Sequence, residues 1–151
     1  MLRAVSIACA VALGSLVNQG AWAADAAQLE ANKKIVVDFY EQGINQKDFE
    51  AAAKHLGSQY IQHNPGVPDG VEGFKSLVKI LRERAPKHRS EIKRVFADGD
   101  FVILHVHSIP QPGAKGAAIV DIFRLENGKI VEHWDVRQDI PDRTANKNGM
   151  F

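Results

Sequence analysis

Two carboxylates and an imidazole lie near the end of the chain at spacings that could support acid–base chemistry. Asp121 lies in one apolar segment, and His133 and Asp135 lie in the next, beyond Asn127-Gly128. Alternate residues of a strand share a face, so His133 and Asp135 point the same way. Burial in an apolar pocket raises the pKa of a carboxylate toward the range of a general base. The pattern indicates removal of a proton α to a carbonyl group.

The register of the hairpin around Asn127-Gly128 decides whether Asp121 joins the other two groups. With a three-residue loop, Asp121 opposes His133, and all three side chains share one face. With a two-residue turn, Asp121 lies beside Trp134, and His133 and Asp135 point to the other face. We favour the three-residue loop, because it gathers the titratable groups on one face of the sheet.

Three further histidines are candidates for a pocket or a metal site. His105 and His107 are two residues apart in a strand, and with His133 and Asp135 they would suit zinc if the strands adjoin. Because two-residue spacing is a weak metal signal, we expect no metal. The alternative for this pair is a position on the sheet surface or at a subunit interface. His63 lies where a strand gives way to a turn, and its alternative role is a turn-stabilising hydrogen bond.

The spacing of apolar residues predicts helices first and strands afterwards, which is typical of an α+β fold with helices on one face of an antiparallel sheet. The first helix should end at Gly43, and the third should begin with a capping box of Asp69 and Glu72. A curved sheet of this kind leaves a pocket where the helices do not reach. The expected helices cover 26–42, the residues after Asp48, and 71–81, and the expected strands cover 60–61, 90–97, 101–109, 117–125 and 129–137.

The N-terminal segment has the pattern of a cleavable export signal. Arg3 precedes an uncharged, mostly apolar run over 4–17, and Ala21-Trp22-Ala23 places small residues at a cleavage site. The apolar run is shorter than the roughly 20 residues that span a bilayer. We therefore expect 1–23 to be removed and 24–151 to form a single periplasmic or secreted domain without membrane association.

The overall composition fits one globular domain and excludes several classes of function. Of the 151 residues, 45% are hydrophobic and 25% are charged, and the formal net charge is +1. Acidic and basic residues are mixed, which argues against a nucleic-acid partner. The sequence has no Gly-x-Ser-x-Gly elbow and no glycine-rich phosphate loop. The only cysteine, Cys9, lies in the export segment, so the mature chain should have neither a disulfide nor a thiol nucleophile.

Several stretches of this sequence resemble the SnoaL-like polyketide cyclases of the NTF2-like superfamily. Residues 121–136, DIFRLENGKIVEHWDV, resemble the final hairpin of that family. Residues 60–65, YIQHNP, the turn Ala97-Asp98-Gly99-Asp100, and the closing Gly149-Met150-Phe151 resemble the branch of predicted aldol-condensation enzymes. The resemblance extends from about Glu30 over nearly all of the remaining chain.

The resemblance implies an NTF2-like α+β cone that forms a homodimer and binds a small-molecule substrate between sheet and helices, without metal or cofactor. In the family's cyclases an aspartate and nearby histidines of the last hairpin are thought to act as acid–base groups. The matching residues here are Asp135 as base, His133 as acid or electrophile, and Asp121 as orienting partner. The alternative is a non-catalytic exported binding protein that returns its ligand unaltered. The expected substrate-binding residues are Tyr60, His63, His105, Phe123 and Trp134.

Overall fold

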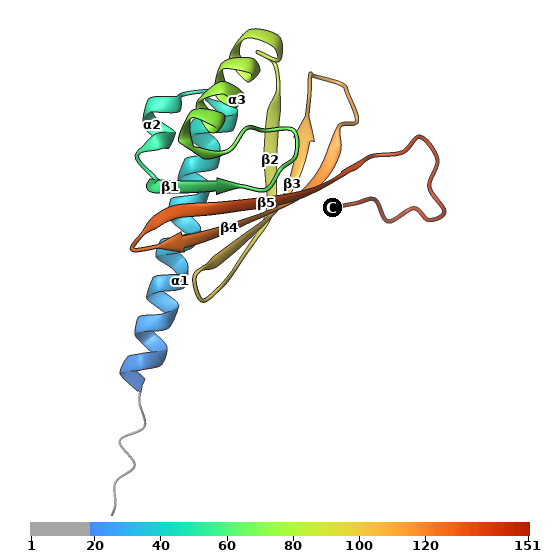
Figure 1. The fold of residues 1–151 in the computed structure, drawn as a ribbon. Helices are drawn as coiled ribbons and strands as arrows, with labels where there is room; N and C mark the ends of the chain where they lie inside the picture. The colour runs from blue at the N-terminus through green and yellow to red at the C-terminus, as the bar shows by residue number, and fades with distance from the viewer. Residues whose placement is uncertain (1–18) are drawn as a thin grey trace, which may run out of the picture.

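The computed structural model describes residues 19–151, and the expected signal segment lies for the greater part outside these residues. Export therefore stays a prediction. Among the described residues, no helix combines the length and apolar character needed to cross a membrane. The described elements are α1 (Gln19–Tyr40), the π-helix η1 (Glu41–Asn45), α2 (Phe49–Ala53), β1 (Leu56–Gln62), α3 (Gly70–Arg84), β2 (Arg89–Asp98), β3 (Phe101–Ile109), β4 (Ala117–Glu126) and β5 (Lys129–Asp139) (Figure 1).

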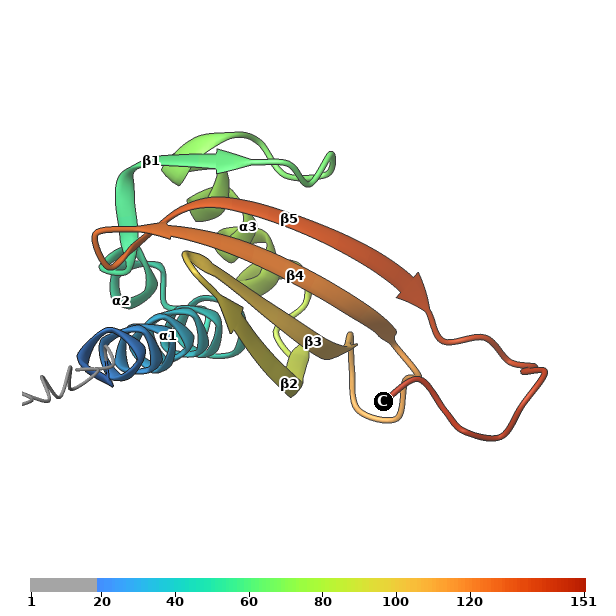
Figure 2. The same cartoon turned by 90° about the horizontal axis from the view of Figure 1, so that it is seen from below.

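A five-stranded sheet in the order β1-β5-β4-β3-β2 forms one layer of the fold. The strands curve over α1 and α3, which lie together on one side of the sheet (Figure 2). Alternation along β3 buries Val102, Leu104 and Val106 against these helices, where Phe39 and Phe74 complete the core. The α+β class and the one-sided helical layer are confirmed. The edge strand β1 differs from expectation, because it is longer than 60–61 and pairs in parallel with β5.

The first helical segment continues beyond the expected stop at Gly43, so that prediction is wrong. The chain passes from α1 into the π-helix η1, which includes Gly43 and ends at Asn45. A Cβ atom at position 43 would lie 2.6 Å from Cζ of Phe74 and 3.2 Å from Cβ of Ala52. Gly43 therefore permits close packing of η1 against α2 and α3 rather than ending a helix.

Two aspartates precede helices, and only one caps its helix with its side chain. Asp48 Oδ1 accepts a hydrogen bond from the backbone N–H of Ala51 at 3.0 Å, at the start of α2. Asp69 precedes α3 but makes no capping hydrogen bond, so the expected capping box is wrong. Its Oδ1 instead accepts from the backbone N–H of Gln62 at 2.8 Å, which ties the end of β1 to the start of α3.

The last hairpin begins with the register of a two-residue turn and changes register further along the strands. Asn127-Gly128 forms a two-residue turn with positive φ values of 50° and 72°. Further along, Val131 is an extra residue in β5 that forms a bulge, and beyond it Asp121 pairs with Asp135 rather than with His133. One inserted residue reverses the facing of every later side chain. The bulge therefore brings the three groups to one face, as expected, through a different pairing.

Candidate functional site

A cavity of about 210 Å³ lies between the sheet and the helical layer. This volume is below the roughly 300–1,000 Å³ of pockets for drug-sized ligands, which favours a small substrate. Apolar and aromatic side chains form most of the wall. The lining residues are Phe39, Tyr40, Ile44, Tyr60, Gln62, Asn64, Val67, Phe74, Leu77, Leu81, His88, Ser90, Ser108, Ile119, Asp121, Phe123, His133, Asp135 and Arg137.

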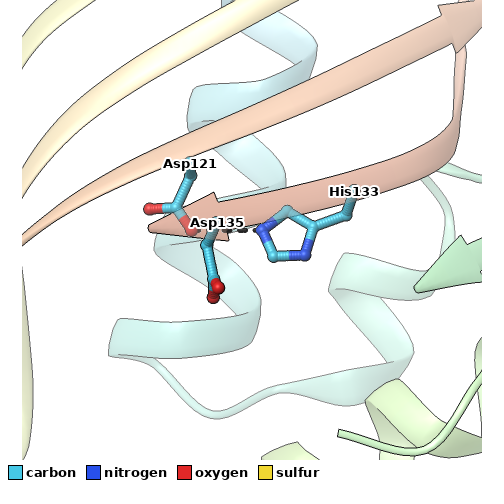
Figure 3. A group of neighbouring side chains, drawn as sticks. All are labelled: Asp121, His133 and Asp135. Carbon is cyan, nitrogen blue, oxygen red and sulfur yellow. Dashed lines mark hydrogen bonds and ion pairs between the residues drawn. The ribbon is translucent and has the colours of Figure 1, made fainter. Parts of the chain in front are cut away.

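The three side chains expected to carry the chemistry meet in this cavity (Figure 3). Asp121 and His133 are buried, with exposed fractions of 4% and 7%, and Asp135 is partly buried. His133 Nε2 lies 3.1 Å from Asp121 Oδ1. One donor atom from each residue lies within 4.8 Å of the others. The structure therefore brings together one imidazole and two carboxyl groups around a common point.

The tautomer of His133 follows from the hydrogen bonds of Gln62. His133 Nδ1 lies 2.8 Å from Gln62 Oε1, and that oxygen also accepts from the backbone N–H of Asn64 at 2.8 Å. An atom that accepts from a backbone N–H is the amide oxygen, so Nδ1 must carry the hydrogen in its contact with Gln62. The contact between Nε2 and Asp121 Oδ1 then contains one shared proton, on either the imidazole or the carboxyl group.

Asp121 is the carboxyl group with the most perturbed environment in the cavity. Burial raises its pKa, the adjacent His133 opposes this rise, and the charge of Asp135 adds to it. Its Oδ2 atom is buried and has no hydrogen-bond partner among the described residues. The Tyr40 hydroxyl lies near Asp121 and, like His133, opposes the rise in the Asp121 pKa. Burial together with the Asp121 charge raises the pKa of Tyr40. Asp121 thus combines a raised pKa with one unused oxygen.

Asp135 is held by a residue that the sequence did not single out. Asn64 Nδ2 donates to Asp135 Oδ2, and Asn64 Oδ1 accepts from the backbone N–H of Gly66 at 2.7 Å. The Gly66 contact fixes the orientation of the Asn64 amide, so its NH₂ group faces the carboxylate. Gln62 and Asn64 alternate with Tyr60 along the chain, and this two-residue spacing is the signal by which both could have been found.

The same alternation explains why His63 and Trp134 do not line the cavity, contrary to expectation. His63 lies between Gln62 and Asn64, so its side chain points to the outer face of the sheet. There its ring stacks on Trp134 with centroids 4.7 Å apart, and its Nε2 lies 2.9 Å from Glu132 Oε1. Trp134 lies between His133 and Asp135 and is outward for the same reason. Neither residue belongs to the cavity wall.

His105 also lies on the outer face, so its predicted place in the pocket is wrong. The buried residues of β3 are those between the histidines, which turns His105 and His107 outward. His105 Nδ1 lies 3.0 Å from an Arg94 guanidinium nitrogen, and His107 Nε2 lies 2.7 Å from the Lys115 carbonyl oxygen. The C-terminal Phe151 ring packs on both imidazoles, at 5.3 Å and 4.5 Å. These two histidines cannot share a metal with the inward-facing groups.

Tyr60 and Phe123 lie in the cavity wall, as expected. Tyr60 is 3% exposed, and burial raises the pKa of its hydroxyl, so the group stays protonated and can donate. The Phe123 ring lies 4.7 Å from the His133 ring and packs against it. Together with Tyr40, these residues surround the two carboxyl groups with an apolar environment that contains hydroxyl donors.

The inward-facing group could also bind a metal ion. Among the residues that the structure describes, Asp121, His133 and Asp135 have donor atoms close enough for one ion. Carboxylate oxygens and an imidazole nitrogen suit zinc, and the Gln62 contact at Nδ1 would fix His133 with Nε2 toward the metal. A metal would have to displace the proton shared by Asp121 and His133. The set differs from the one considered from the sequence, which included His105.

The fold and the cavity define this chain as an NTF2-like α+β protein. The model of the SnoaL-like polyketide cyclase family matches residues 34–144, and the chain belongs to that family. This finding confirms the resemblance seen in the last hairpin. No match is found among curated proteins.

Three solved structures illustrate the likeness. A protein from Acidithiobacillus ferrooxidans, provisionally described as a polyketide cyclase, is 26% identical over 71% of this chain and 87% of its own, with a TM-score of 0.58. An NTF2-like protein of unknown function from Burkholderia xenovorans is 17% identical over 77% of this chain and 89% of its own, with a TM-score of 0.62. TsrD from Streptomyces laurentii is 19% identical over 72% and 88%, with a TM-score of 0.60.

Proposed function

We propose that this chain catalyses proton transfer at a carbon α to a carbonyl group, leading to aldol-type cyclisation or isomerisation of a small substrate. The observation that carries the proposal is the buried Asp121, whose pKa is raised in a largely apolar cavity and whose Oδ2 has no partner among the described residues. Burial of this kind raises the proton affinity of a carboxylate toward the range useful to a general base.

The contacts favour a distribution of roles that differs from the one expected from the sequence. Both nitrogens of His133 are engaged, Nδ1 with Gln62 and Nε2 with Asp121. His133 is therefore a positioning residue, and Asp121 is the group that reaches the substrate. Oδ2 of Asp121 removes the α-proton while the proton shared between Oδ1 and His133 rests on Nε2, so the pair gains one positive charge as the enolate forms.

The enolate oxygen requires a donor, and the two tyrosines of the cavity supply it. Burial keeps the hydroxyls of Tyr40 and Tyr60 protonated, so each can donate to a developing negative charge. In cyclisation the enolate carbon attacks a second carbonyl of the same molecule, and the new alkoxide takes the proton from Asp121 Oδ2. In isomerisation that proton returns to a different carbon. Both sequences conserve all atoms.

Asp135 influences this chemistry through its charge and its position. Its negative charge contributes to raising the pKa of Asp121, after burial. Asn64 holds its carboxylate at the cavity wall, where it can accept a hydrogen bond from a substrate hydroxyl. If Asp135 were instead the base, its replacement would remove activity and replacement of Asp121 would leave part of it.

Exchange of α-hydrogens into D₂O tests the proposal without knowledge of the natural substrate. Levulinate and heptane-2,6-dione serve as probes, and NMR measures loss of the α-proton signals. The protein should accelerate exchange of at least one probe, and Asp121→Asn should lower that rate by about 10²–10⁴-fold. His63→Gln, on the outer face, is the matched control and should keep the wild-type rate. An unchanged rate in Asp121→Asn would refute the proposal.

A non-catalytic binding protein is the second candidate, supported by the mainly apolar wall of the cavity. It predicts saturable binding of small carbonyl compounds, recovery of the ligand unaltered, and no acceleration of exchange. We further propose that the chain is exported and forms a homodimer. The outer sheet face supports the dimer, because exposed apolar residues gather there: Phe96, Phe101, Val120 and Val136.

A further inference from the structure

A second set of polar groups lines the same cavity, further along the strands from Asp121. Ser108 in β3 pairs with Ala117, four residues before Asp121 in β4, and Ser90 in β2 pairs with Ser108. His88 and Arg137 complete this part of the wall. None of these residues takes part in the proton transfer proposed above. We name the set of His88, Ser90, Ser108 and Arg137 the distal polar cluster.

The π-helix η1 fixes the backbone that carries this cluster. Asn45 Oδ1 accepts from the backbone N–H of Ser90 at 2.7 Å, and Asn45 Nδ2 donates to the Ser90 carbonyl oxygen at 2.9 Å. Lys47 Nζ donates to the carbonyl oxygen of His88 at 3.0 Å. Lys47 is 8% exposed and has a positive φ of 58°, a conformation that is costly for a residue other than glycine. Short π-helical segments and residues with a strained backbone are both frequent at functional sites.

The cluster contains polar atoms with unused hydrogen-bonding capacity. Ser90 is 2% exposed, and its Oγ has no partner at hydrogen-bond distance among the described residues, although it lies near enough to the Tyr40 hydroxyl to oppose the rise in the Tyr40 pKa. His88 Nδ1 is also buried without a partner in the described part of the chain, whereas His88 Nε2 lies 3.0 Å from Ser108 Oγ. Buried polar atoms are almost always hydrogen-bonded, so two neighbouring exceptions in one cavity wall call for a ligand. A Ser hydroxyl and a neutral imidazole N–H would both donate to an acceptor.

The charge of this region is opposite to that around Asp121 and Asp135. Lys47 and Arg137 lie near enough to His88 to lower its pKa, in addition to the larger effect of burial. The Arg137 side chain is half-exposed, and its ion pair is with the exposed Asp139 at 2.7 Å. Exposed pairs of this kind are weak, so the guanidinium can exchange Asp139 for a ligand. The cluster therefore places the cation Arg137 in the cavity wall, whereas Asp121 and Asp135 are the acidic groups of that wall.

We propose that the distal polar cluster binds a carboxylate of the substrate, so that the substrate is a small keto acid whose carbonyl region faces Asp121. Arg137 forms charge-assisted hydrogen bonds with the carboxylate at the cavity mouth, and Ser90 and His88 donate from the buried wall. The assignment of the reacting region rests on the proposed proton transfer. The binding of the carboxylate depends only on the cluster.

Paired ligands that differ only in charge provide the test. Calorimetry measures binding of levulinate, of its one-carbon-longer homologue, and of the methyl ester of each to the full chain. We expect at least one acid to bind about tenfold or more tightly than its ester, as an ion-assisted hydrogen bond provides. Arg137→Gln should abolish the difference and Ser90→Ala should reduce it. Arg94→Gln, which removes an arginine contact on the outer face, should leave it unchanged.

The two proposals fail separately in this design. Acids that bind no more tightly than their esters, or an unchanged preference in Arg137→Gln, would overturn the carboxylate site even where α-proton exchange is accelerated. A preference lost in Arg137→Gln, without accelerated exchange by the wild-type chain, would support the carboxylate site and refute the enzyme. Circular dichroism of each variant confirms that it is folded.

Discussion

The free energy of unfolding of Asp121→Asn, minus that of the wild type, should increase as the pH rises. The folded-state pKa of Asp121 is raised, mainly by burial. Between the ordinary pKa of a carboxyl group, about 3.9, and this raised value, the folded state holds a proton that the unfolded state has lost. The free energy of unfolding of the wild type therefore falls with rising pH across that window. The amide of the Asp121→Asn variant cannot ionise, so the variant lacks this decline.

The structure sets the size and the form of the effect. One proton bound only in the folded state gives a slope of about −1.4 kcal/mol per pH unit, and the slope vanishes above the folded-state pKa. The Asn side chain has the same shape as the carboxyl group, and its NH₂ can donate to His133 Nε2 because Nδ1 holds the hydrogen toward Gln62. The variant should thus keep the local packing.

Urea unfolding of both proteins at several pH values, at one protein concentration, measures the difference directly. The stability of Asp121→Asn minus that of wild type should increase with pH from about 4 and then become constant. Subtraction removes the titrating groups that do not interact with Asp121, which both proteins share. A difference that is independent of pH, or that decreases as the pH rises, would refute the inference that burial raises the Asp121 pKa.

Other contacts lead to four further predictions. Asp135→Asn should shift the acidic limb of the pH–rate profile to lower pH, since the Asp135 charge contributes to raising the Asp121 pKa. A limb at the wild-type pH in steady-state rate measurements would contradict this. Gly43→Ala should lower the free energy of unfolding by about 1–3 kcal/mol in urea titration, because the new Cβ would approach Cζ of Phe74 to 2.6 Å. Equal stability of the two proteins would show that η1 and α3 can move apart without cost. Val136→Asp, at a residue 69% exposed on the outer sheet face, should dissociate the proposed dimer in light scattering, and a monomeric wild type would remove that proposal. Untagged protein should contain less than about 0.2 equivalents of metal by elemental analysis, because a metal ion would have to displace the proton shared by Asp121 and His133. Occupancy near one equivalent would contradict this, as expected of a site that couples metal binding to folding.

Periodicity along the chain predicted most of the fold, because each element buries one regular face. The α3 stripe and the alternation of β3 follow directly from Phe74 and Val78 and from Val102 and Leu104. The expected registers did not include the bulge at Val131, where two consecutive buried residues, Ile130 and Val131, interrupt the alternation of β5. The prediction therefore placed Asp121 on the correct face of the sheet but paired it with His133 instead of Asp135.

The candidate site was predicted in part for the same physical reason. His133 and Asp135 share a face of one strand, and pleating fixes that relationship wherever the strand lies. Asp121 lies on the neighbouring strand, so its place on the same face depends on the register of the hairpin. His63 was chosen for its chemistry, but β1 is an edge strand with apolar residues at both 60 and 61, so the sequence did not show which face was buried. The structure resolves this in favour of Gln62 and Asn64, two neutral amides whose importance depends on contacts with distant residues.

A crystal structure with a bound cyclic enone, such as 3-methylcyclohex-2-enone, tests the central claim most directly. The account predicts the ligand inside the cavity, with an α- or γ-carbon about 3–3.5 Å from Asp121 Oδ2 and its carbonyl oxygen on a tyrosine hydroxyl. His133 should keep its contacts with Gln62 and Asp121. A ligand held on the outer face, or one in the cavity whose reactive carbons lie beyond reach of Asp121, would contradict the account.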